Sequence, residues 1–136
     1  MQRSIHQIYS FKASIADVWR ALTDPKWIDE WGGGPAKMDG SVGTKFTLWG
    51  GDIHGTNIEV LPKRKLVQEW YGGKWPAPSI VTFELSSHGE TTTITLTHLD
   101  LPEKAFKEIE EGWREYYLGP LQGFLEQRRE ESLYAS

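Results

Sequence analysis

The sequence has 136 residues, a formal net charge of −4 at pH 7 and no cysteine. This length suits one domain that buries a sizeable core, and we expect a single domain over residues 1–136. The negative charge argues against a surface that binds phosphates, so nucleic acid is not an expected partner. No stretch of about 18 apolar residues is present, so we expect no membrane span. The lack of cysteine excludes disulfides and thiol chemistry and fits a reducing, cytoplasmic compartment.

Aromatic residues are numerous, with seven Trp, five Tyr and five Phe. Rings in this number indicate either a bulky solid core or an aromatic-lined cavity. Large rigid rings pack together in few ways, which makes gaps in an interior more frequent. We therefore favour a cavity lined by some of these rings.

The first part of the chain predicts one strand and two short helices. Residues 5–11 alternate in polarity, as a strand with one buried face does. Ser14, with Asp17 three residues later, is typical of a helix N-cap, and Asp24-Pro25 gives a second helix start. The two helices should bury large residues: Ile15, Val18, Trp19 and Leu22 in the first, and Trp27, Ile28 and Trp31 in the second.

From residue 46 the apolar period changes to two, which is typical of strands. Turn residues at Gly50-Gly51, 62–65, 72–78 and 86–90 divide the region. The segments between these turns predict an antiparallel meander, with strands near residues 46–48, 53–61, 66–71, 81–85 and 91–98.

The last quarter of the chain predicts one long helix over residues 102–126. Large apolar groups recur every three or four residues, at Phe106, Ile109, Trp113, Tyr116 or Tyr117, Pro120 and Phe124. A helix of that length is a rod of roughly 40 Å, long enough to cover a sheet. Pro120 cannot donate a backbone hydrogen bond, so we expect a kink near it. Strand, two helices, meander and long helix together form an α+β pattern.

Several motifs resemble a known family. Asp24-Pro25 followed by Trp31 and Gly34-Pro35 resembles the second-helix signature of the START-like, birch-pollen-allergen-like (SRPBCC) superfamily. Further stretches are similar to the C-terminal domain of the activator of the heat-shock protein 90 ATPase: residues 46–55, 59–62, 65–70, 75–76 and 111–117. The resemblance implies a helix-grip fold, in which a curved antiparallel sheet of six to seven strands wraps around the long helix. Two short helices would lie between the first two strands, and many members hold a small hydrophobic ligand between sheet and helix.

The resemblance leaves two binding functions open. The first is a non-enzymatic domain that binds a small apolar molecule or lipid. The second is a co-chaperone-like module, active in stress response, whose partner is a chaperone of the heat-shock protein 90 type. Eukaryotic activators hold the chaperone through a separate N-terminal domain that this sequence lacks, so we expect a stand-alone module, either a monomer or a weak dimer.

No constellation of residues predicts an enzyme, and we expect no metal and no cofactor. The sequence contains no Gly-x-Ser-x-Gly turn and no phosphate loop, and its four histidines lack metal-ligand spacing. Asp52 and His54 would share a strand face and could form an acid–base pair, although we favour a solvated pair at the strand start. His98 alternates with buried positions, which favours a hydrogen-bonded core histidine. A small cyclase- or hydrolase-like enzyme that uses His54 or Tyr117 is the weaker alternative.

Carboxylates on the predicted sheet form a further alternative. Glu59, Glu69 and Glu84 could meet across neighbouring strands, and burial would then raise their pKa values. Each alternates with apolar neighbours, however, so we interpret them as charges on the outer face.

The expected cavity lies under the long helix, where the fold would bring rings from separate elements together. Tyr117 and His54 are the polar anchors that we expect there. The candidate pocket residues are Trp31, Trp49, His54, Trp70, Trp75, Phe83, Trp113, Tyr117 and Phe124.

Overall fold

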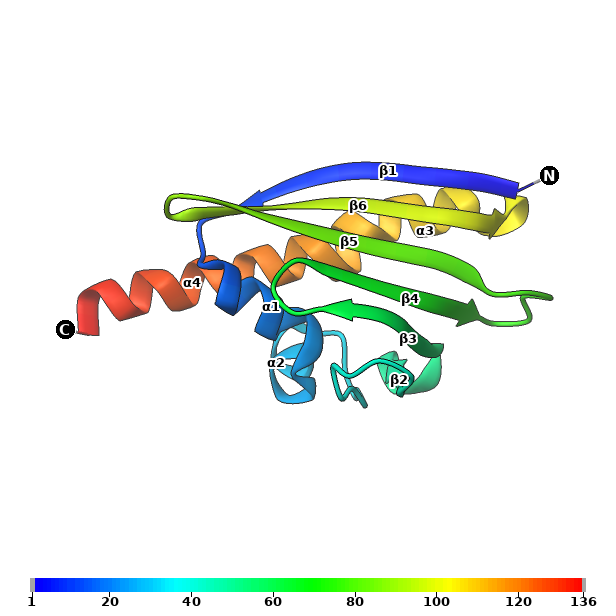
Figure 1. The fold of residues 1–136 in the computed structure, drawn as a ribbon, viewed down its shortest axis with the longest axis horizontal. Helices are drawn as coiled ribbons and strands as arrows, with labels where there is room; N and C mark the ends of the chain where they lie inside the picture. Colours follow the sequence, from blue (N-terminus) through cyan, green and yellow to red (C-terminus); the bar gives the residue numbers. More distant parts are fainter. Residues whose placement is uncertain (1, 136) are drawn as a thin grey trace.

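A computed structural model describes residues 2–135, with side chains described over residues 3–133, and has the predicted α+β architecture (Figure 1). A single antiparallel sheet lies against one long, irregular helix. The strands are β1 (Gln2–Phe11), β2 (Lys45–Leu48), β3 (Ile53–Leu61), β4 (Lys65–Gly72), β5 (Ser79–His88) and β6 (Thr91–Pro102). The helices are α1 (Ile15–Thr23), α2 (Pro25–Trp31), α3 (Phe106–Gly112) and α4 (Gly119–Ala135).

The strand order β1-β6-β5-β4-β3-β2 confirms the meander from β2 to β6. β1 pairs with β6 at the far edge, although the two strands are the first and last along the chain. Side chains alternate between two faces, so that Leu66, Phe83 and Leu96 are fully buried on the face that meets the helix. The threonines of β6 at odd positions are only half-buried on the other face, which an antiparallel sheet can leave in contact with water.

Both short helices start where their caps predict. The Ser14 Oγ accepts a hydrogen bond from the Asp17 N–H at 3.1 Å, and an Asp24 carboxylate oxygen accepts one from the Lys26 N–H at 2.9 Å. Each bond satisfies a donor that the first helical turn leaves free. Gly32 ends α2 in the left-handed conformation, with φ 107°. The buried Trp27 of α2 packs edge-on against Phe124 of α4, at 5.3 Å between ring centroids.

The long helix departs from α geometry just before Pro120, where the kink is predicted. Residues Trp113–Leu118 form a π-helical segment, η3, between α3 and α4. The Gly119 N–H donates to the Arg114 carbonyl five residues back, which is the π pattern. A Cβ at Gly119 would lie 2.1 Å from that oxygen, so the segment requires glycine there. Pro120 lacks an N–H and leaves the carbonyls of this turn short of one donor.

None of the helices in the described residues is both long and apolar enough to cross a bilayer.

Candidate functional site: an aromatic cavity under the long helix

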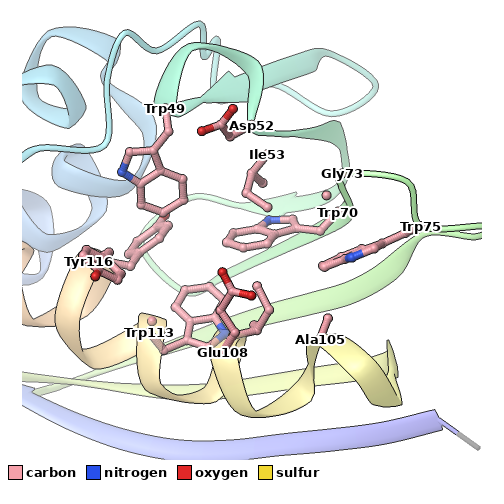
Figure 2. A pocket seen from close by; sticks show the side chains of 14 residues that line it. Trp49, Asp52, Ile53, Trp70, Gly73, Trp75, Ala105, Glu108, Trp113 and Tyr116 are labelled. Atoms are coloured by element: carbon pink, nitrogen blue, oxygen red, sulfur yellow. The ribbon is translucent and has the colours of Figure 1, made fainter.

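A cavity of about 460 Å³ lies between the start of the long helix and the adjacent ends of β3 and β4 (Figure 2). Its walls are mostly aromatic and aliphatic, with three glycines and two carboxylates. The lining residues are Trp49, Asp52, Ile53, Trp70, Gly72, Gly73, Trp75, Ala105, Glu108, Ile109, Gly112, Trp113, Tyr116 and Tyr117. Asp52, Gly73, Glu108 and Tyr116 are exposed to solvent, so the cavity opens to the outside through them.

Trp49 forms one wall from a strained position. Its φ of 48° lies in the left-handed region, which costs a bulky residue on the order of 1 kcal/mol or more. Two hydrogen bonds hold it there: its backbone N–H donates to the Gly33 carbonyl at 2.7 Å, and its indole Nε1 donates to the Gly32 carbonyl at 3.0 Å. The Gly-rich turn after α2 therefore fixes the ring over the cavity.

Trp70 of β4 and Trp113 of η3 stack across the sheet–helix boundary, with 4.8 Å between ring centroids and 27° between ring planes. The Trp113 Nε1 donates to His98 Nδ1 at 3.1 Å, and the His98 Nε2 lies 2.7 Å from the Ser79 Oγ. Because an indole N–H only donates, His98 Nδ1 must accept and Nε2 must carry the proton. The Ser79 hydroxyl can then donate onward to the Trp70 carbonyl, 3.3 Å away.

His98 is thus the hydrogen-bonded core histidine that its position predicted. It is fully buried, and this burial lowers the pKa of the imidazole to about 3. The ring is therefore neutral at physiological pH and serves as a fixed acceptor for Trp113.

The second indole is held by a separate buried chain. The Trp70 Nε1 donates to the Gln68 Oε1 at 2.8 Å, and the Gln68 Nε2 donates to the Asn57 Oδ1 at 2.8 Å. Asn57 in turn donates to the Thr44 hydroxyl at 3.3 Å. Buried networks whose members are satisfied fix side-chain orientation, so this part of the cavity wall is preorganised.

Tyr117 lies at the centre of the aromatic cluster. Its ring centroid lies 4.7 Å from that of Trp31 and 4.8 Å from that of Trp113, and it is 1% exposed. The hydroxyl oxygen is buried and has no hydrogen-bond partner among the described residues. Burial raises the pKa of this phenol, because the charged form loses its hydration.

The remaining walls come from a loop and from the first turns of the long helix. A backbone hydrogen bond from the Trp75 N–H to the Gly72 carbonyl closes the loop after β4. A Cβ at Gly72 would lie 3.0 Å from the Trp75 ring, so glycine lets that ring settle over the strand end. Opposite, Glu108 projects from α3, and Asp52 stands on the sheet side (Figure 2). Ile109 of α3 also lines the cavity.

The structure brings five of the expected pocket residues to the cavity: Trp49, Trp70, Trp75, Trp113 and Tyr117. Trp31 and Phe83 lie behind this wall, in ring contact with Tyr117. Phe124 lies elsewhere, against Trp27.

His54 lies outside the cavity, exposed and stacked on Tyr71 at 5.5 Å between ring centroids. The expected shared face of Asp52 and His54 is wrong. Asp52 precedes β3 and has helical dihedrals (φ −58°, ψ −36°), so the alternation of a strand does not extend to it. Asp52 therefore lines the cavity while His54 does not.

The carboxylates of Glu59, Glu69 and Glu84 lie outside the cavity, as their interpretation as outer-face charges requires. Glu59 and Glu84 are exposed and Glu69 is half-buried, and a Glu59 carboxylate oxygen lies 3.5 Å from the Lys65 ammonium. Within the described residues, no three His, Asp or Glu side chains gather closely enough to hold a metal ion.

Several lining residues were not predicted as pocket residues, notably Ile53, Glu108, Ile109 and Tyr116, and Asp52 was considered only as a partner of His54. The helical stripe contains Ile109 and leaves Tyr116 and Tyr117 as alternatives. The π-helical segment makes both relevant, since its wider turn keeps Tyr117 buried and puts Tyr116 at the rim with 62% exposure.

A curved antiparallel sheet packed on one long helix, with an aromatic cavity between them, defines a START-like domain of the helix-grip type. Residues 12–126 match the model of the family described as "Activator of Hsp90 ATPase homolog 1-like protein", and the chain belongs to this family.

Individual relatives are similar over much of the chain. "Activator of 90 kDa heat shock protein ATPase homolog 1" of Homo sapiens is 23% identical over 111 residues, which is 79% of this chain and 32% of the relative. The homolog of Dictyostelium discoideum is 34% identical over 80 residues, 57% of this chain and 21% of the relative. The matched part is therefore about a third or less of these relatives' length.

Solved structures share the fold. "PFC0360w, an HSP90 activator from plasmodium falciparum" has a TM-score of 0.84 at 26% identity, covering 90% of this chain and 95% of that one. CalU16 from Micromonospora echinospora has a TM-score of 0.77 at 30% identity, covering 98% and 87%.

Proposed function

We propose that this domain binds a small, largely apolar molecule in the cavity between the sheet and the long helix. The observation that carries the proposal is the cavity itself: about 460 Å³, open at its rim and walled by aromatic rings. Ligand sites in proteins have volumes of roughly 300–1,000 Å³ and mostly apolar walls with a few polar groups. The hydrogen bonds that hold Trp49, Trp70 and Trp113 support this function, because a preorganised wall loses less entropy on binding.

A blocking variant tests this proposal. Gly112 lines the cavity, and a Cβ there would meet only Tyr116, at an ordinary contact distance of 3.7 Å. Gly112→Leu should fill part of the cavity without disturbing the core. Gly123→Leu is the matched control, because a Cβ at Gly123 meets nothing within 4 Å and this position does not line the cavity.

Binding is measured by tryptophan fluorescence and thermal melting with a panel of lipids, sterols and aromatic metabolites. We expect at least one compound to shift both signals in the native protein and the Gly123→Leu variant, and to lose its effect in Gly112→Leu. If no compound acts, or if Gly112→Leu binds as well as the native protein, the proposal fails.

A second candidate function is interaction with a chaperone of the Hsp90 type. Membership of the family supports it, as does the likeness to PFC0360w, whose name gives it as an HSP90 activator. Affinity capture with Hsp90 from the same organism, followed by an ATPase assay, tests this candidate. Capture together with stimulation supports the interaction, and absence of both removes it.

The enzymatic alternative receives less support from the geometry. His54 stacks on Tyr71 outside the cavity, and the Tyr117 phenol is buried with a raised pKa, which makes proton release harder.

A further inference from the structure

The charged side chains that line the cavity are all acidic. Among the lining residues that the structure describes, the charged ones are Asp52 and Glu108, and none is Lys, Arg or His. Neither carboxylate has an ion-pair partner among the described residues. They stand on opposite sides of the space, Asp52 before β3 and Glu108 on α3 (Figure 2).

Most side-chain donors of the walls are already used. The indole N–H groups of Trp49, Trp70 and Trp113 donate to the Gly32 carbonyl, Gln68 and His98 respectively. The Tyr117 hydroxyl is covered by its neighbours. The cavity therefore presents aromatic rings together with two carboxylates, and its remaining side-chain donors are the Trp75 indole N–H and the Tyr116 hydroxyl. Such a site repels an anion and attracts a cation.

We infer that the ligand of this cavity is a flat apolar molecule that carries a positively charged amine or quaternary ammonium group. The apolar part packs between the rings of Trp49, Trp70 and Trp75, and the charged group lies at the rim between Asp52 and Glu108. This inference rests on the proposed function and specifies the chemical class of its ligand. At this exposed rim the two carboxylates supply the main attraction for the charged group, and a nearby tryptophan face adds to it.

Three probes with one ring system test the inference by isothermal titration calorimetry at low salt: (2-naphthylmethyl)trimethylammonium, 2-naphthylmethanol and 2-naphthylacetate. The quaternary probe keeps its charge at every pH. We expect it to bind about tenfold more tightly than the neutral probe, and we expect the anion to bind most weakly. Of the three probes, only the cationic one should bind more weakly when salt is added, because salt screens its attraction to the carboxylates.

The double variant Asp52→Asn, Glu108→Gln should bring the affinity for the cationic probe down to that for the neutral probe, and should leave the neutral probe unaffected. The matched control is Glu84→Gln, Glu130→Gln, which removes the same charge from exposed positions outside the cavity. This control variant should still bind the cationic probe more tightly than the neutral one.

The outcomes separate the two proposals. Equal or tighter binding of the neutral or anionic probe, or an unchanged preference in the cavity double variant, overturns the inference and leaves a ligand cavity. Failure of all three probes to bind the native protein overturns the inference, and the additional absence of any hit in the wider panel overturns both.

Discussion

The hydroxyl of Tyr117 is buried without a hydrogen-bond partner among the described residues. A buried, unsatisfied hydroxyl costs about 1–3 kcal/mol of desolvation that its removal recovers. Tyr117→Phe should therefore leave the free energy of unfolding unchanged or raise it by about 1 kcal/mol. Urea denaturation measures this effect. A loss of more than about 1 kcal/mol would show that the hydroxyl is bonded in solution.

His98 should make the protein sensitive to mild acid. The pKa of His98 is about 3 in the folded protein and about 6.5 in the unfolded chain. Between these pH values the unfolded chain therefore binds a proton that the folded protein does not bind. This contribution to stability is complete above pH 6.5 and is lost as pH falls towards 3. Between pH 7 and pH 5 the loss should be about 2 kcal/mol.

Urea denaturation at several pH values checks this expectation with two variants. His98→Gln should be less stable at pH 7 but should show a flatter pH dependence between pH 7 and 5. His54→Gln removes an exposed imidazole and should retain the native slope. Equal slopes in all three proteins would exclude His98 as the source.

At the scale of single residues, the sequence predicts which face of a strand or helix a side chain occupies. It does not predict whether that face borders a cavity or a solid core. Alternation along β4 suffices to turn Gln68 and Trp70 inward, and both are buried. The same rule misplaces Asp52, because one residue with helical dihedrals interrupts the alternation. Whether an inward ring borders open space or solid core depends on close ring packing, as with Trp70 and Phe83, and no local pattern specifies that.

At the scale of elements, two glycines of α4 should respond in opposite ways to substitution by alanine. Gly119 follows the π-helical segment directly, and Gly123 lies one turn further on. A Cβ at Gly119 would lie 2.1 Å from the Arg114 carbonyl oxygen, whereas a Cβ at Gly123 meets nothing within 4 Å. Gly119→Ala should therefore destabilise the fold by roughly 1–3 kcal/mol, as overpacking does. Gly123→Ala should stabilise it by about 0.5–1 kcal/mol, since alanine favours a helix.

Thermal or urea denaturation of the two variants decides between a required π turn and an adaptable one. If both alanines stabilise the protein, the segment relaxes into an ordinary α-helix at little cost, and the π geometry is not required by the fold.

Element boundaries with a chemical cause were predictable. The caps at Ser14 and Asp24 and the stop at Gly32 act within a few residues, so local sequence contains them. Pro120 located the irregularity of the long helix without revealing its type. A widened turn results from the close approach of Gly119 to Arg114 and from the packing of Trp113 and Tyr117 on the sheet, neither of which the helical stripe encodes.

At the scale of the whole molecule, β1 is the strand that completes the sheet. Phe11 is fully buried, whereas Ile8 on the same strand is 64% exposed. Phe11→Ala should lower the free energy of unfolding by about 3–5 kcal/mol. Ile8→Ala should change it by no more than about 0.5 kcal/mol, as surface substitutions do. Chemical denaturation compares the two, and similar losses would mean that β1 contributes little through its buried face.

The position of β1 beside β6 also has a consequence for the order of folding. β2 to β6 can pair successively through short turns, but β1 has no partner until β6 has been made. Its pairing closes a long loop, and such non-local contacts form slowly. During synthesis the first strand therefore remains an unpaired edge, able to associate with other chains. Docking of β1 on β6 removes this unpaired edge and with it one route to aggregation.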